Sequence, residues 1–379
     1  MKAIRLAAYG VSSRLGWLCG SLLITLGCAG QGSTLAAPGA PSAAPGSTES
    51  ASPPTAATSQ RQAADPGTPG LARGTGSPGD RELAKGDAAF RAEDSEGARA
   101  SYQRARELAP NDPAPRVGLV RVTLMELGLG LEYAGAPNDP RVQALLQEVD
   151  TALRLDPKYA PAHVERGLLL LLLGDAAEAL KALERGASGV AENAELHSAL
   201  GVARIATGDT SGALTHFKRA VELDPERAGR LASLGTAYLI QGQLTEAIRA
   251  YENAARLAPD NARIQTDLGT ALAAAGQVDR ALPHLKRAVE LAPDTPTFLS
   301  NLGYAHQQKG ELQRAITLYR QALALNDQLA AAWVNLGTAL AKQGDLKEAR
   351  QAFEAAERLD PTDPRPKANL EELDALEAK

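Results

Sequence analysis

The feature that most constrains this chain is a period of 34 residues that runs through much of its length without insertion or deletion. One glycine series with this spacing comprises Gly167, Gly201, Gly235, Gly269, Gly303 and Gly337. A bulky apolar series in step with it comprises Leu183, Phe217, Tyr251, Leu285, Tyr319 and Phe353. A fixed period of this length is typical of arrays in which each unit buries its apolar face only against its neighbours. The sequence therefore predicts a stack of similar units rather than one central core.

The residues within one period identify the kind of unit. One period reads Trp333, Leu336-Gly337, Leu340, Ala349, Phe353 and Pro361. This pattern resembles the tetratricopeptide repeat, a helix–turn–helix unit of 34 residues. The resemblance implies an all-α solenoid of about eight repeats, wound into a right-handed superhelix.

The repeats define the predicted domain boundaries. We expect the array over residues 81–363, with an insertion at about 128–140 in the second repeat, where the spacing between closing prolines is too long. Residues 364–379 place three leucines among charged residues, which indicates a C-terminal capping helix. Residues 28–80 are rich in Pro, Gly, Ser, Thr and Ala, so they cannot bury enough apolar surface to offset the entropy of ordering. We therefore expect a disordered tether before the array.

The N-terminus has the form of an export signal. Lys2, Arg5 and Arg14 precede an apolar stretch over 15–26, which is too short to span a bilayer comfortably. The stretch ends in Leu26-Gly27-Cys28, which resembles the lipobox of a bacterial lipoprotein, although the family prefers Leu where Thr25 stands. The alternative is an ordinary signal peptide cut elsewhere, for example at Ala29-Gly30.

The lipobox resemblance implies a location. Residues 1–27 would be a cleaved signal peptide, and Cys28 would carry the acyl chains that anchor the protein to a membrane. Residue 29 is Ala rather than Asp, which resembles lipoproteins sorted to the outer membrane. We therefore predict a protein of the bacterial cell envelope, most simply with its repeats facing the periplasm.

The composition argues against catalysis and nucleic-acid binding. The net charge is −5 at pH 7, so no strongly basic face for nucleic acid is expected. The two cysteines both lie within residues 1–28, and none of the five histidines has the spacing of a metal motif. No nucleophile motif is recognisable either. We predict no catalytic residues, metal, cofactor or small-molecule substrate.

The predicted binding face is the concave groove that the family resemblance implies. Its positions lie one, four and five residues after the first glycine of each repeat. They are apolar in the N-terminal half and polar toward the C-terminus, where Tyr304 stands. Asn301 and Asn335 precede Leu-Gly pairs, a position at which asparagine ladders of some families bind extended peptide backbones. The apolar stripe comprises Leu168, Leu171, Leu172, Val202, Ile205, Leu239 and Ile240.

Two interpretations of the apolar stripe are open. It is a docking site for an apolar or amphipathic segment of a partner, or the curvature of the array buries it against the adjacent repeat. With the first, the sequence predicts a non-enzymatic scaffold that binds a peptide or helix of a partner protein, similar to the pilotins that assist secretin assembly. The alternative function is an accessory subunit of a polysaccharide or peptidoglycan enzyme complex in the periplasm.

Overall fold

The computed structural model describes residues 69–129, 133–190 and 192–377, in which every regular element is an α-helix. The predicted signal peptide, Cys28 and most of the predicted tether lie outside these residues. The first helices of the repeats are α2 (Pro78–Arg91), α4 (Ala114–Leu127), α6 (Ala160–Leu173), α8 (Ala194–Ala206), α10 (Ala228–Ile240), α12 (Ala262–Ala274), α14 (Pro296–Gln308) and α16 (Ala330–Gln343). The second helices are α3 (Ser95–Leu108), α5 (Pro140–Leu155), α7 (Ala176–Ala187), α9 (Thr210–Leu223), α11 (Leu244–Leu257), α13 (Val278–Leu291), α15 (Leu312–Leu325) and α17 (Leu346–Leu359), and α18 (Pro364–Glu377) follows them.

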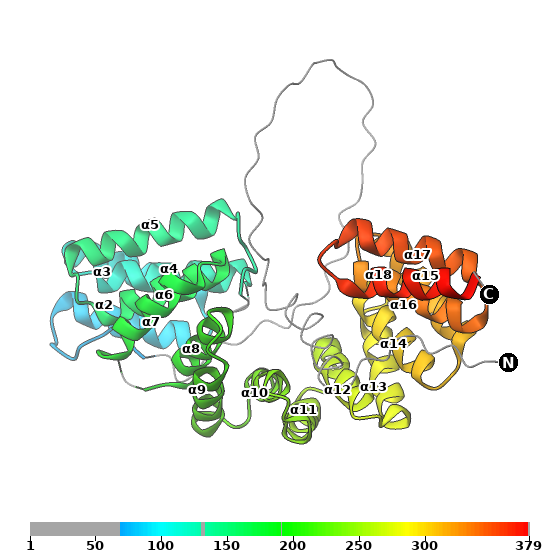
Figure 1. Cartoon of the computed structure of the whole chain (residues 1–379). Coiled ribbons are helices and arrows are strands. Elements are labelled where there is room, and N and C mark those ends of the chain that lie inside the picture. Colours follow the sequence, from blue (N-terminus) through cyan, green and yellow to red (C-terminus); the bar gives the residue numbers. More distant parts are fainter. Residues whose placement is uncertain (1–68, 130–132, 191, 378–379) are drawn as a thin grey trace, which may run out of the picture.

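The helices pair in chain order into eight repeats, from repeat 1 (α2 and α3) to repeat 8 (α16 and α17). Each second helix packs on its own first helix and on the first helix of the next repeat, and successive first helices also contact one another. The array is an arc with α10 and α11 at its base, and the first helices of the central repeats lie on its inside (Figure 1). We call the surface lined by the first helices the inner face. The predicted all-α solenoid is confirmed.

The repeated glycines lie where the two helices of a repeat approach most closely. A Cβ atom on Gly235 would lie 2.9 Å from two ring carbons of Tyr251, and one on Gly201 would lie 2.7 Å from Cζ of Phe217. Both aromatic rings are fully buried. The glycine series and the bulky series therefore form one interlocking contact, repeated along the array.

The second glycine series forms the turns between the helices of each repeat. Its φ angles lie between 74° and 103°, a region that side chains with a Cβ rarely adopt. Its members are Gly174, Gly208, Gly242, Gly276, Gly310 and Gly344. In repeat 4 the next residue, Asp209, caps the second helix by accepting a 2.8 Å hydrogen bond from the backbone N–H of Gly212.

The segment between α4 and α5 covers the end of α6. The backbone N–H groups of Ala134 and Ala136 donate to the carbonyl oxygens of Leu171 and Leu172 at 2.8 and 3.0 Å. The hydroxyl of Tyr133 donates to the carbonyl of Gly174 at 2.6 Å. These bonds satisfy carbonyl groups that the last turn of a helix leaves without partners. The insertion thus has a structural role at the C-terminus of an unusually apolar helix.

The start of the array differs from the prediction. Helix α2 begins at Pro78, and residues 69–77 pack against the first repeats, so the predicted tether to residue 80 is too long. Leu71 is only 2 % exposed and belongs to the apolar cluster of repeats 1 to 3. One apolar anchor and the acceptors described below hold this Gly- and Pro-rich segment in place.

None of the helices in the described ranges is both long and apolar enough to cross a membrane.

Candidate functional site

The apolar stripe predicted as a docking surface is part of the core. Six of its seven members are between 0 and 8 % exposed, namely Leu168, Leu171, Leu172, Val202, Ile205 and Leu239, and only Ile240 is half-buried. Successive first helices touch one another, so side chains at inner positions fill the space between helices. The docking interpretation of these six residues is therefore wrong, and the burial interpretation holds.

The C-terminal inner positions are different in chemistry and in exposure. Asn301 and Tyr304 on α14 are half-buried and reach solvent. Asn335, at the corresponding position of α16, is 6 % exposed, and its side-chain Nδ2 has no hydrogen-bond partner. A buried donor without a partner costs stability, and a ligand or water that accepts from it would recover part of this cost.

Helix α12 of repeat 6 adds two polar groups to this face. Thr270 is 7 % exposed, and its hydroxyl also has no hydrogen-bond partner. Asp267, one turn earlier, is half-buried. By contrast, Thr236 of repeat 5 shares hydrogen bonds with a carbonyl of its own helix and with the hydroxyl of Tyr251. The inner face of repeats 6 to 8 thus carries polar groups that the chain itself leaves unsatisfied.

The inner face of the first repeats already holds an extended segment, residues 69–73, which we call the strap. The backbone N–H groups of Leu71 and Ala72 both donate to Oδ2 of Asp87, at 2.7 and 2.9 Å. Asp87 directly follows Gly86 on α2, which is the inner position that Thr270 occupies in repeat 6. The carboxylate is buried and also accepts from the hydroxyl of Tyr102 at 2.9 Å.

Charged side chains hold both ends of the strap. At one end, the Arg121 guanidinium on α4 donates to the carbonyl of Pro69 at 2.8 Å and forms a buried ion pair with Glu165 on α6. At the other end, Arg73 forms a two-point ion pair with Asp112, with N–O distances of 2.9 and 3.2 Å.

The ring of Tyr159, at the start of α6, lies 5.2 Å from the guanidinium carbon of Arg73. The first repeats therefore bind one extended segment: side chains of α2 and α4 bind its backbone, the apolar cluster takes Leu71, and Asp112 and Tyr159, which lie just before α4 and α6, bind its cation. Composition gave no sign of this contact, because the strap lies inside a stretch with the character of a linker.

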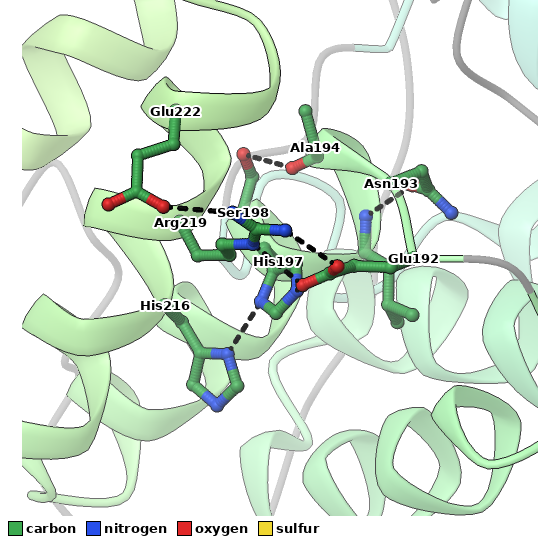
Figure 2. A network of polar contacts seen from close by, with 9 residues as sticks. Glu192, Asn193, Ala194, His197, Ser198, His216, Arg219 and Glu222 are labelled. Carbon is green, nitrogen blue, oxygen red and sulfur yellow. Dashed lines mark hydrogen bonds and ion pairs between the residues drawn. The ribbon is translucent and has the colours of Figure 1, made fainter.

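A second polar cluster joins the helices of repeat 4 (Figure 2). Nδ1 of His197 lies 2.9 Å from Nδ1 of His216, and Nε2 of His197 lies 2.9 Å from Glu192. Hydrogen bonds from Arg219 and then from His197 lower the pKa of Glu192 to about 2. Burial, followed by the charges of His197 and Arg204, lowers the pKa of His216.

The histidine contact requires a single proton between the two Nδ1 atoms, so it holds with one ring as donor and the other as acceptor. If both rings were fully protonated, both Nδ1 atoms would carry a hydrogen, neither could accept, and the hydrogen bond would be lost.

In the described ranges, no group of three or more His, Cys, Asp or Glu side chains could hold a metal ion.

The comparison with protein families identifies the array. The tetratricopeptide repeat family matches in six overlapping segments, 146–189, 176–228, 198–262, 232–296, 266–329 and 300–364, which together cover more than half of the chain. The chain belongs to the tetratricopeptide repeat family. Members of this family are generally non-catalytic scaffolds, and the fold is consistent with protein scaffolding or peptide binding. No curated protein matches the sequence.

Solved structures support the fold of this tetratricopeptide array. The Cut9–Hcn1 hetero-tetramer of the APC/C superimposes with a TM-score of 0.58 at 15 % identity, over 78 % of this chain and 55 % of that one. This chain thus spans little more than half of the length of that structure, and the likeness shows the fold alone. A further match is MamA from Desulfovibrio magneticus RS-1, with 22 % identity and a TM-score of 0.41 over 45 % of this chain and 97 % of that one. Another is YrrB, described as a tetratricopeptide protein with an unusual peptide-binding site, with 23 % identity and a TM-score of 0.40 over 50 % of this chain and 97 % of that one.

Proposed function

We propose that this protein is a non-enzymatic scaffold of the cell envelope that binds an extended segment of a partner protein on the inner face of repeats 6 to 8. The strap is the observation that carries the proposal. It shows an extended segment of protein lying across first helices and held by their side chains. The same face in repeats 6 to 8 has no such segment in the described part of the chain.

The chemistry of repeats 6 to 8 suits an extended backbone. Asn301 offers both a donor and an acceptor toward solvent, as a peptide group requires. Thr270 and Asn335 have polar atoms that the chain leaves without partners. Both atoms are buried, so a bound peptide reaches them only through a small movement of side chains or through a bridging water, and the hydrogen bonds then formed would offset the cost of leaving these atoms unpaired.

We also propose that the scaffold is a lipoprotein. The basic N-terminus, the short apolar stretch and Leu26-Gly27-Cys28 support cleavage before Cys28 and its acylation, with the repeats facing the periplasm from the outer membrane. The strap joins the membrane tether to the inner face of repeats 1 to 3, which leaves the opposite end of the arc for a partner. A pilotin-like role in assembling a secretion or pilus complex fits this arrangement.

Binding is tested with a matched pair of asparagine variants of the full chain. Asn301→Ala changes the inner face, and Asn253→Ala changes an exposed residue of the second helix α11. Envelope proteins that co-purify with the wild type should be lost with Asn301→Ala and kept with Asn253→Ala. Equal retention by both variants would contradict the proposed site.

The anchor is tested with Cys28→Ser. The wild type should fractionate with membranes and carry acyl chains in its mass spectrum, and the variant should move to the soluble fraction. A wild-type protein without acyl chains would refute the lipoprotein proposal and leave the binding proposal standing.

A further inference from the structure

The inner face of repeats 6 to 8 carries the carboxylate of Asp267, whose counterpart in repeat 3, Glu165, is already paired with Arg121. Asp267 lies on α12 between the inner faces of repeats 5 and 7, where the corresponding positions hold the neutral Ser233 and Asn301. No hydrogen bond or ion pair within 4 Å reaches its carboxylate from the described residues. Arg263, one turn earlier on the same helix, acts on it only through its charge.

The environment of this carboxylate favours a cation. Burial raises the pKa of Asp267 to about 6, and Arg263 lowers it only in part. The group is therefore largely ionised at pH 7, although the surrounding protein has already removed much of its hydration. Folding has already removed water from this carboxylate, so binding a cation there does not incur the cost of desolvating it again. The cation therefore gains a strong interaction with the carboxylate.

The strap shows how this protein binds a cation of an extended segment. Arg73 pairs with Asp112, in the loop between α3 and α4, and its guanidinium lies over the ring of Tyr159, directly before α6. Asp267 and Tyr304 supply the same two kinds of group, a carboxylate and a tyrosine ring, but from the first helices of repeats 6 and 7 rather than from the segments that precede α4 and α6. Helices α12 and α14 are in direct contact.

We propose that Asp267 and Tyr304 form a specificity site for a lysine or arginine side chain of the bound segment. The ammonium or guanidinium group donates to the Asp267 carboxylate, and the stem of the side chain packs along the ring of Tyr304. This inference rests on the proposed function, because it names the residue that the bound segment must present at repeats 6 and 7. It predicts that segments with an acidic residue at this point are rejected.

The test uses peptides that copy the strap. Four synthetic peptides carry the sequence of residues 66–77 with Arg, Lys, norleucine or Glu at the position of Arg73, and their binding to the full chain is measured by fluorescence anisotropy. The Arg and Lys peptides should bind about tenfold more tightly than the norleucine peptide, and the Glu peptide more weakly still. A tenfold preference corresponds to about 1.4 kcal/mol.

The variant Asp267→Asn should abolish this preference, and Asp267→Glu should retain part of it. The control is Asp279→Asn, which changes an exposed carboxylate on the second helix of the same repeat and should leave the preference intact. Thermal melting of each variant shows that the array remains folded.

The outcomes separate the two proposals. Peptides that bind without regard to the cation, or a preference that survives in Asp267→Asn, would overturn the specificity site and leave peptide binding in place. A wild-type chain that binds none of the four peptides would contradict both proposals.

Discussion

Replacing Gly235 with alanine tests the close contact on which every repeat depends. The new Cβ atom would lie 2.9 Å from Cδ1 and Cε1 of Tyr251 and 3.0 Å from its Cζ. Because the ring of Tyr251 is fully buried, it has no open space to move into. The matched control is Gly229→Ala on the same helix, where a Cβ atom meets nothing within 4 Å.

The expected magnitude follows from two opposing effects. Gly→Ala in a helix favours folding by up to about 1 kcal/mol. Overpacking a buried contact costs about 1–3 kcal/mol. The variant at 229 should therefore be as stable as the wild type or slightly more stable, and the variant at 235 should be less stable than the variant at 229 by about 1–3 kcal/mol.

Thermal and urea unfolding followed by far-UV circular dichroism measure the difference, which corresponds to about 2–4 °C per kcal/mol for a domain of this size. Hydrogen exchange adds a local readout, because long repeat arrays do not always unfold in one step. Faster exchange in α10 and α11 should accompany the loss at 235. Equal stability of the two variants would refute the close-contact explanation of the glycine series.

Three other perturbations have defined outcomes. Glu165→Gln removes the anion that faces the buried Arg121 guanidinium, so urea unfolding should show that the free energy of unfolding falls by about 3–5 kcal/mol. An unchanged free energy of unfolding would show that this ion pair does not stabilise the fold. Because the folded pKa of Asp267 is raised, ionisation of its carboxyl disfavours the folded state. Asp267→Asn should therefore raise stability by about 1 kcal/mol at pH 7.5, allowing for partial exposure, and the gain should shrink as the pH falls below 6. A gain that is undiminished at pH 4.5 would contradict this reasoning. Because the folded pKa of His216 is lowered, the stability that its neutral ring contributes is present above about pH 6.5 and lost at lower pH. The melting temperature of His216→Gln should therefore fall less than that of the wild type between pH 7.5 and 5. Equal losses in the two proteins would argue against the histidine contact as the cause.

The repeated part of the fold was predictable because each repeat obeys local rules. Gly208 and its equivalents mark the turns, and Gly235 with Tyr251 marks the packing of one helix on the other. These requirements recur every 34 residues, so the sequence states them several times. The array and the pairing of helices follow from that periodicity, and the C-terminal helix follows from the leucines placed among charged residues over 364–379.

Contacts between distant segments were not predictable in the same way. Leu172 and Ile205 were candidates for an open groove, and their burial depends on how closely successive first helices approach, which a single repeat does not specify. The strap was missed because Leu71 is one apolar residue in a stretch otherwise typical of linkers. The partners of the strap, Asp87 and Arg121, lie 16 and 52 residues along the chain from the groups that they bind, and the 34-residue pattern gives no information about such a contact.

Site-specific photo-crosslinking in the native cell tests whether the inner face of the C-terminal repeats binds a partner segment. A photoreactive amino acid replaces either Gln308, exposed at the end of the first helix α14, or Gln321, exposed on the second helix α15 of the same repeat. We expect a discrete crosslinked partner from position 308 that disappears in the Asn301→Ala background, and none from position 321. Crosslinks from 321 alone, or crosslinks from 308 that persist unchanged with Asn301→Ala, would contradict this expectation.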